Sequence, residues 1–159
     1  MNLIHLHLLL NHLPVVGTLC GFGLLAFALW RRSTDLKRAA LGVLVISALV
    51  AIPAYMTGEP AEDGVKGLPG ISRALIEQHE EAAGVALGGL LTVGVAALAG
   101  LIWFRGSRLM PAWFGVITLI GALIVTGLMA WTANLGGQVR HTEIRPGATR
   151  AAPGERAHE

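Results

Sequence analysis

Four long apolar segments constrain this chain more than any other feature of its sequence. They run from Leu13 to Trp30, from Ala39 to Tyr55, from Ala82 to Phe104 and from Pro111 to Leu135. A helix needs about 20 mostly apolar residues to cross the hydrocarbon core of a bilayer, and each segment comes close to this length or exceeds it. With 53% hydrophobic and 14% charged residues, the chain is also too apolar for an ordinary soluble domain. We therefore predict an all-α integral membrane protein, folded as an antiparallel four-helix bundle.

The predicted spans cover residues 8–30, 39–57, 80–104 and 111–135, within one domain of residues 1–141. Pro53 should kink the second span near its end, and Gly136 and Gly137 are suited to end the fourth. If the spans alternate in direction, the first and third helices lie diagonally in the bundle. Residues 142–159 are rich in Pro, Gly and charged residues, which is typical of a disordered tail.

The charges of the two short turns predict an orientation. Residues 31–38 and 105–108 together hold six basic residues and one acid, and basic turns favour the cytoplasmic side. Both termini and the long loop after the second span then lie outside the cell membrane. Arg140, Arg145 and Arg150 count against this orientation, because they place basic residues outside.

Other classes of function have little support in the sequence. Cys20 is the single cysteine, so neither a disulfide framework nor a thiolate metal cluster is expected. Basic runs with interleaved aromatic residues are missing, so nucleic acid is not an expected partner. The chain also lacks a glycine-rich phosphate loop and the residue order of a serine hydrolase.

Five of the six histidines fall at one end of the predicted bundle. The starts of the first and third helices share a membrane face with the ends of the second and fourth, whichever side of the membrane this is. A polar group at the edge of the hydrocarbon core is costly without a partner, so we interpret this histidine end as the candidate functional site. Its residues are His5, His7, His12, His79 and His141, with Asn11, Tyr55, Glu59, Glu62, Glu77, Glu80 and Asn134.

His12 is the histidine that solvation explains least, because apolar residues flank it on both sides. His79 lies at a similar depth near the start of the diagonal helix. At about 100° per residue, His5 and His12 share one helix face, whereas His7 points about 160° away from it. We therefore predict that His12 and His79 are the pair that binds a cofactor or a metal.

Three interpretations fit this cluster. Imidazoles from two helices can ligate the iron of a b-type haem, with Gly17, Gly84 and Gly88 leaving room for the flat ring. In the second interpretation, the three N-terminal histidines and nearby acids bind copper or zinc. In the third, the histidines only fasten helices together through hydrogen bonds.

The loop between the second and third spans, Gly58–Gly70, is predicted to fold over the histidine end. Glu59 or Glu62 would then accept a hydrogen bond from an imidazole N–H. Carboxylates select the tautomer of metal-bound histidines in this way.

Four segments resemble those of a group of bacterial four-helix membrane proteins of uncharacterised function. They are residues 5–14, with His-x-His and Asn-His-Leu-Pro, and residues 55–62, 76–81 and 131–141. The resemblance covers the chain to about His141 and implies the four-helix fold and a bacterial inner membrane, but no activity. Di-haem cytochromes differ from this chain, because they carry histidines at matched depths on both membrane sides.

The sequence thus predicts a cytochrome b-like membrane haem subunit that passes electrons near the outer face, to or from quinone or a partner redox protein. The alternatives are a non-catalytic subunit of a larger complex and a copper- or zinc-binding membrane protein. An oligomer is compatible with each of them.

Overall fold

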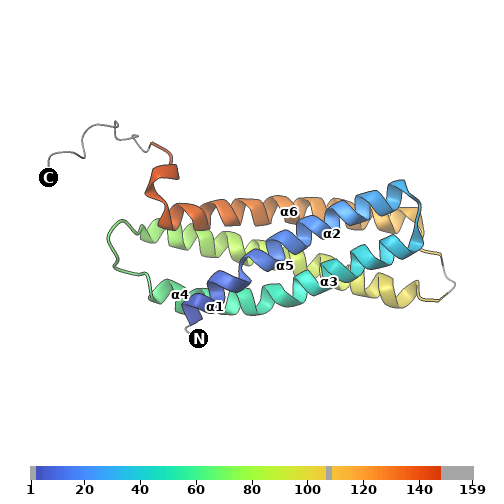
Figure 1. Cartoon of the computed structure of the whole chain (residues 1–159), viewed down its shortest axis with the longest axis horizontal. Coiled ribbons are helices and arrows are strands. Elements are labelled where there is room, and N and C mark those ends of the chain that lie inside the picture. Colours follow the sequence, from blue (N-terminus) through green and yellow to red (C-terminus); the bar gives the residue numbers. More distant parts are fainter. Residues whose placement is uncertain (1–2, 107–108, 148–159) are drawn as a thin grey trace.

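The computed structural model describes residues 3–106 and 109–147. Four long helical segments pack antiparallel in it, and each is long and apolar enough to span a membrane (Figure 1). The predicted all-α four-helix membrane fold is confirmed. The elements are α1 (Leu3–Leu10), α2 (His12–Trp30), α3 (Thr34–Met56), α4 (Gly58–Asp63), α5 (Arg73–Trp103), α6 (Ala112–Arg140) and a short 3-10 helix, η1 (Thr142–Ile144).

The first span consists of two helices, α1 and α2, and Pro14 explains the break between them. Proline has no N–H to donate to the carbonyl of Leu10, and its ring crowds the preceding turn. The helix is therefore interrupted at Asn11, although the Asn11 N–H still bonds the His7 carbonyl oxygen at 2.9 Å. The second span behaves differently, since α3 runs past Pro53 and ends at Met56.

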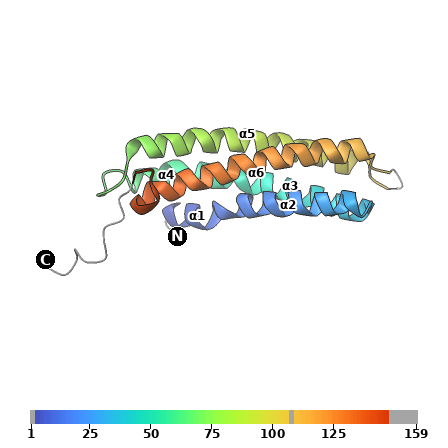
Figure 2. The same cartoon turned by 90° about the horizontal axis from the view of Figure 1, so that it is seen from above.

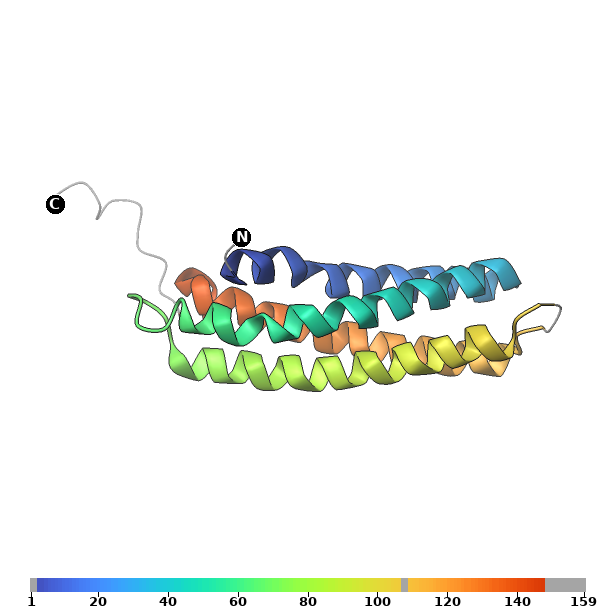
Figure 3. The ribbon, with the colours of Figure 1, turned by 90° about the horizontal axis from the view of Figure 1, so that it is seen from below.

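The long helices form a closed ring in which α2 packs on α3, α3 on α5, α5 on α6 and α6 on α2. Figures 2 and 3 show this arrangement from two opposite sides. The first and third spans are therefore diagonal, as predicted. Small residues let the neighbouring helices approach closely, because Gly17 lies against Ser47 and Gly94 against Ala48.

The helices extend further than the apolar segments do. α5 begins at Arg73 and α6 continues to Arg140, so both project beyond their predicted spans at the histidine end. η1 forms the first part of the predicted tail, where Arg145 Nη2 donates to the carbonyl oxygen of Gly70 at 2.7 Å. Residues 148–159 of the tail, with Arg150, and Ser107 and Arg108 of the second basic turn lie outside the described residues.

Basic side chains fasten the end of the bundle opposite the histidines. Arg38 Nη2 donates to the carbonyl oxygens of Phe104 at 2.9 Å and Gly106 at 2.7 Å. Lys37 is buried and its Nζ lies 3.5 Å from the carbonyl oxygen of Met110. The connection between α5 and α6 is thereby held against the start of α3.

Candidate functional site: a histidine pair at one end of the bundle

His7 lies on the inner face of α1, half-buried where α3 gives way to α4. Its Nδ1 is 3.0 Å from the carbonyl oxygen of Ala54 and 3.3 Å from Thr57 Oγ1. A carbonyl oxygen only accepts hydrogen bonds, so Nδ1 carries the proton and donates it to Ala54. In the tautomer with its proton on Nδ1, Nε2 carries the lone pair that could bind a ligand.

His79 has the same arrangement on α5. Its ring is half-buried, and Nδ1 lies 3.0 Å from the carbonyl oxygen of Thr132 on α6. By the same reasoning Nδ1 carries the proton and Nε2 is left with its lone pair. The absence of a side chain at Gly136 makes room for this ring, since a Cβ there would lie 2.9 Å from His79 Cε1.

The structure places these two imidazoles at the same end of the bundle. His7 lies on α1 and His79 on α5, which belong to diagonal spans. Within residues 3–106 and 109–147, hydrogen bonds are described at both Nδ1 atoms and at neither Nε2. Two imidazoles whose Nδ1 atoms are held by backbone carbonyl oxygens therefore lie at the same end of the bundle.

His12, which the sequence favoured as the partner of His79, lies elsewhere. Its ring is exposed on the outer face of α2. Its Nδ1 is 3.3 Å from the carbonyl oxygen of Leu8, four residues earlier in the chain. His5 is exposed as well, whereas His7 is half-buried. The predicted division of the three histidines between two faces is therefore confirmed, but His7 lies on the inner face and His12 does not.

A stripe of residues in the sequence could have identified His7. Positions that alternate between spacings of four and three residues follow the inner face of a packed helix. Those from Pro14 onward are buried in α2, and the same spacing leads back to His7. The stripe consists of His7, Asn11, Pro14, Thr18, Gly21, Leu25 and Ala28. His79 similarly precedes the buried residues Ala82, Ala86, Leu90, Val93 and Ala97 of α5.

Asn11 lies one turn after His7 on this stripe. Its Oδ1 is buried, and no hydrogen-bond partner for it is described in the part of the chain that the structure covers. A buried amide oxygen without a donor is unfavourable, so such atoms are rare in folded proteins. Asn11 is thus a polar group on the inner face that is available to a bound molecule.

The loop after α3 folds over the histidine end, as predicted. Its first residues form α4, which packs against α1, and Gly58 lies next to the His7 ring. The predicted bond from Glu59 or Glu62 to an imidazole is not among those that the structure describes. Glu59 is exposed, and Glu62 Oε1 lies 2.8 Å from Lys66 Nζ. The hydrogen bond that an imidazole was expected to donate to a carboxylate goes, for His7, to the Ala54 carbonyl oxygen instead. Only Thr57 separates α3 from α4, so the chain here is helical and not an open loop.

The remaining candidates lie away from the histidine pair. His141 is exposed after α6 and its Nδ1 is 2.9 Å from Glu143 Oε1. A hydrogen bond to its own backbone N–H, and secondarily the one to His141, lowers the pKa of Glu143. The expectation that His141 is a solvated histidine agrees with this position.

The glycines that were expected to leave room for a haem differ in their surroundings. The space beside Gly17 is filled by Ser47 in the contact between α2 and α3, and Gly88 faces outward. Gly84 lies at the histidine end, where the Tyr55 hydroxyl packs over it. The glycines that lie against the imidazoles are instead Gly58, next to His7, and Gly136, next to His79.

The donor set favours some metal centres over others. In the described part of the chain, no three residues among His, Cys, Asp and Glu are arranged to hold a metal ion. Bare zinc normally takes three or four protein ligands. Haem iron takes at most two from the protein, because the porphyrin supplies the rest. A pair of imidazoles therefore fits the axial sites of a haem better than it fits a bare ion.

Comparison with known proteins found no matching family model, no matching curated protein and no matching solved structure. The resemblance to bacterial four-helix membrane proteins therefore stays a prediction beyond the helical fold itself.

Proposed function

We propose that this protein is a membrane haem b-binding subunit with His7 and His79 as the axial ligands. One observation carries the proposal: two imidazoles from diagonal spans each have Nδ1 bonded to a backbone carbonyl, and no hydrogen bond to either Nε2 is found within residues 3–106 and 109–147. Haem iron with two histidine ligands requires such a pair. His7 replaces His12 of the sequence prediction, because His12 faces outward.

The residues around the pair would serve a bound haem in definite ways. The carbonyl oxygens of Ala54 and Thr132 keep the protons on Nδ1 and orient the rings, and such bonds also make a ligand more basic. α4 covers the site from the loop side. When bound, the haem would supply reversible one-electron transfer.

The site lies near one membrane face, so we propose that electrons pass to and from a quinone or a partner redox protein at that face. The basic turns Arg31–Arg38 and 105–108 at the other end favour the cytoplasmic side for that end. The histidine end, with both termini, would then face outward from a bacterial inner membrane.

A non-catalytic role is the competing interpretation, and one observation favours it. The Nδ1 bond of His7 joins α1 to α3, and that of His79 joins α5 to α6, so both also fasten helices together. A copper or zinc site is less well supported, because a third ligand is not arranged around the pair in the described residues.

Visible spectra test the proposal. The protein, expressed with added haem precursor and purified in a mild detergent, should show a low-spin b-type spectrum that sharpens on reduction with dithionite. His7→Ala and His79→Ala should each abolish this spectrum. His5→Ala and His12→Ala are matched controls on the outer face of the same span and should retain it.

Two results would contradict the proposal. Loss of the spectrum in His12→Ala, with retention in His7→Ala, would restore the ligand pair expected from the sequence. A protein that stays colourless after haem is supplied would indicate a structural role. In that case His7→Ala and His79→Ala should lower the thermal unfolding midpoint without any spectral change.

A further inference from the structure

The end of the bundle opposite the histidines carries a strong positive charge. Among residues 3–106 and 109–147, five basic side chains and one acid, Asp35, lie there, which gives a net charge of +4. The other described acids belong to α4, to the start of α5 and to η1, at the histidine end. The five basic residues, which we call the basic end, are Arg31, Arg32, Lys37, Arg38 and Arg105.

Few of these charges have a partner within the chain. Asp35 Oδ1 lies 3.8 Å from Arg38 Nη1 and its side chain is 96% exposed, so this ion pair contributes little. The side chains of Arg31, Arg32 and Arg105 are exposed, and no hydrogen bond or ion pair from them is described in the part of the chain that the structure covers. The basic end therefore has guanidinium groups available to an anion from outside the chain.

Lys37 lacks a counter-ion inside the fold. The residue is only 7% exposed, and its one described hydrogen bond, to the carbonyl oxygen of Met110, is 3.5 Å long. The ion pairs found among the described residues do not include Lys37. An ammonium group has three donors, and a buried cation without a counter-ion is unfavourable. An anion held at the adjoining surface would offset this cost.

Arg32 adopts a backbone conformation that suits glycine. Its φ is 53°, in the left-handed region, and its N–H closes the end of α2 by donating to the Leu29 carbonyl oxygen at 3.2 Å. Glycine is the usual residue at this position of a helix end, because it has no Cβ to clash. An arginine here strains the turn, and no side-chain contact described within residues 3–106 and 109–147 compensates for the strain. A contact with an external anion would do so.

Three tryptophans place the basic end at the surface of the bilayer. Trp30 ends α2, Trp103 ends α5 and Trp113 lies in the first turn of α6, and all three side chains are exposed. Figure 1 shows these helix ends together at one end of the bundle. Exposed tryptophans concentrate at the level of the lipid head groups. The neighbouring basic side chains therefore lie against the layer that contains the lipid phosphates.

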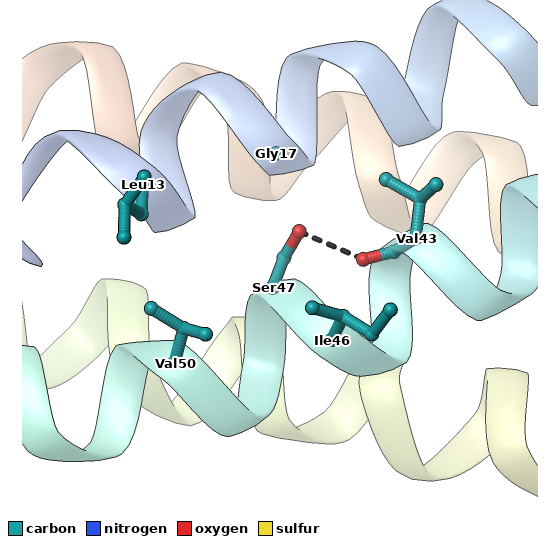
Figure 4. A pocket seen from close by; sticks show the side chains of 6 residues that line it. All are labelled: Leu13, Gly17, Val43, Ile46, Ser47 and Val50. Atoms are coloured by element: carbon teal, nitrogen blue, oxygen red, sulfur yellow. Dashed lines mark hydrogen bonds between the residues drawn. The ribbon is translucent and has the colours of Figure 1, made fainter.

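Farther from this end, the surface between α2 and α3 is apolar. Figure 4 shows Ser47 there among apolar side chains. The Ser47 hydroxyl donates to the Val43 carbonyl oxygen at 2.8 Å, so it has no proton left for an anion. On this face, donors for an anion are found at the basic end and not in the apolar middle.

We propose that the basic end binds anionic phospholipids, with the guanidinium groups of Arg31, Arg32 and Arg105 donating to the phosphate oxygens. Guanidinium groups match phosphate in charge and geometry, and basic clusters directly beside a membrane span attract anionic lipids. A zwitterionic lipid carries its own positive charge next to its phosphate, so it does not neutralise the net charge of the basic end. The inference concerns the end away from the histidine pair and does not depend on haem.

Tryptophan fluorescence can measure this preference in the full-length protein. In a Trp131→Phe background, the remaining tryptophans all lie at the basic end. The protein is placed in mixed vesicles of phosphatidylglycerol and phosphatidylcholine, in which one lipid at a time carries brominated chains that quench tryptophan on contact. Brominated phosphatidylglycerol should quench more strongly than brominated phosphatidylcholine. In about 1 M sodium chloride, where the Debye length is about 3 Å, the difference should largely disappear.

Arginine variants test the contacts. Arg31→Gln and Arg32→Gly should each reduce the preference severalfold, up to about fivefold, because one basic residue near an anionic surface contributes about this factor. Arg32→Lys keeps the charge and should retain most of the preference. Arg73→Gln removes an exposed arginine from the histidine end and is the matched control that should leave the preference unchanged.

The unfolding midpoint separates a lipid contact from a structural role of Arg32. In phosphatidylcholine alone, Arg32→Gly should raise the midpoint, because glycine fits the left-handed backbone. A residue needed only for the fold would lower the midpoint when it is replaced. The same variant should therefore be more stable and less selective for anionic lipid.

Four outcomes would overturn the inference. Equal quenching by the two brominated lipids in the Trp131→Phe protein would show that the basic end has no lipid preference. A preference that Arg31→Gln and Arg32→Gly retain would assign it to other groups, and loss of preference in Arg73→Gln would reduce it to total charge. Loss of the preference on addition of soluble glycerophosphoglycerol would show that a free phosphate compound, and not a membrane lipid, is the anion recognised.

Discussion

The imidazole of His79 packs so closely against Gly136 that a methyl group there would lie 2.9 Å from the ring carbon Cε1. The same ring donates through Nδ1 to Thr132, one turn earlier on α6. Glycine at position 136 therefore sets how closely His79 approaches the fourth span. The orientation of its Nε2 depends on both contacts.

Gly136→Ala should displace the His79 ring, because the added methyl group overlaps it. Overpacking of this kind typically costs about 1–3 kcal/mol, so the thermal unfolding midpoint should fall. If haem is bound, its reduced spectrum should also shift or weaken. Gly127→Ala is the matched control on α6, since nothing lies within 4 Å of the added methyl group. Equal midpoints and spectra for the two variants would contradict the importance of this contact.

Gly17→Ala should separate α2 from α3, because the added Cβ would overlap the Ser47 side chain. The expected loss is again about 1–3 kcal/mol in the free energy of unfolding. Gly23→Ala on the same helix has open space around the new methyl group and should be neutral or slightly stabilising. Detergent-induced unfolding followed by circular dichroism would measure both. The contact would lose its assigned role if the two variants unfolded alike.

Lys66 should hold α4 in place in a manner that depends on pH. Its Nζ lies 2.8 Å from Glu62 Oε1 and 3.1 Å from Asp63 Oδ1, and hydrogen bonds to these carboxylates raise the pKa of Lys66 above its ordinary 10.5. Because the pKa of Lys66 is higher in the folded state than in the unfolded state, the stabilisation of α4 by Lys66 is complete below pH 10.5. It is lost as the pH rises through the raised value.

A spin label at Leu68→Cys, in a Cys20→Ser background, would measure this effect. Its mobility should be low at neutral pH and should increase above pH 10.5, where Lys66 loses its charge. Lys66→Met should be mobile at neutral pH and should lack the transition. Arg73→Met, at the exposed start of α5, should behave like the wild type. A transition that persists in Lys66→Met would assign the effect to another group.

The orientation in the membrane can be measured at two exposed positions in the same Cys20→Ser background. Asp35→Cys lies at the start of α3 and Leu68→Cys in the loop at the histidine end. In intact spheroplasts, an impermeant maleimide should label position 68, whereas position 35 should react only after lysis. The opposite pattern would reverse the orientation and leave the histidine pair unchanged.

The sequence predicted the spans and their diagonal order because apolar length and short turns are local features. It also predicted which histidines share a helix face, because that depends only on the helical repeat. It did not predict that His7 lies inside. In lipid, the outward and inward faces of a helix are equally apolar, so Leu8 and Leu9 can be exposed without cost. The inward face is recognised by close-packing residues such as Thr18 and Gly21.

The sequence also did not predict the hydrogen-bond acceptors of the two imidazoles, for a different reason. Ala54 and Thr132 contribute only backbone carbonyl oxygens, and their side chains give no sign of this role. Which carbonyl a histidine reaches depends on how one helix is placed against its neighbour. The acids Glu59 and Glu62 were conspicuous in the sequence, yet Glu62 pairs with Lys66 and Glu59 is exposed.

The histidine pair lies at one end of the bundle, and the opposite end has no histidine among the described residues. Electrons that enter and leave at the same face do not cross the bilayer. One charge moved through 100 mV corresponds to about 2.3 kcal/mol, so a relay across the whole membrane would respond strongly to the membrane potential. If the proposed electron transfer through His7 and His79 takes place, its rate should be the same in energised and de-energised vesicles, because no electron crosses the bilayer.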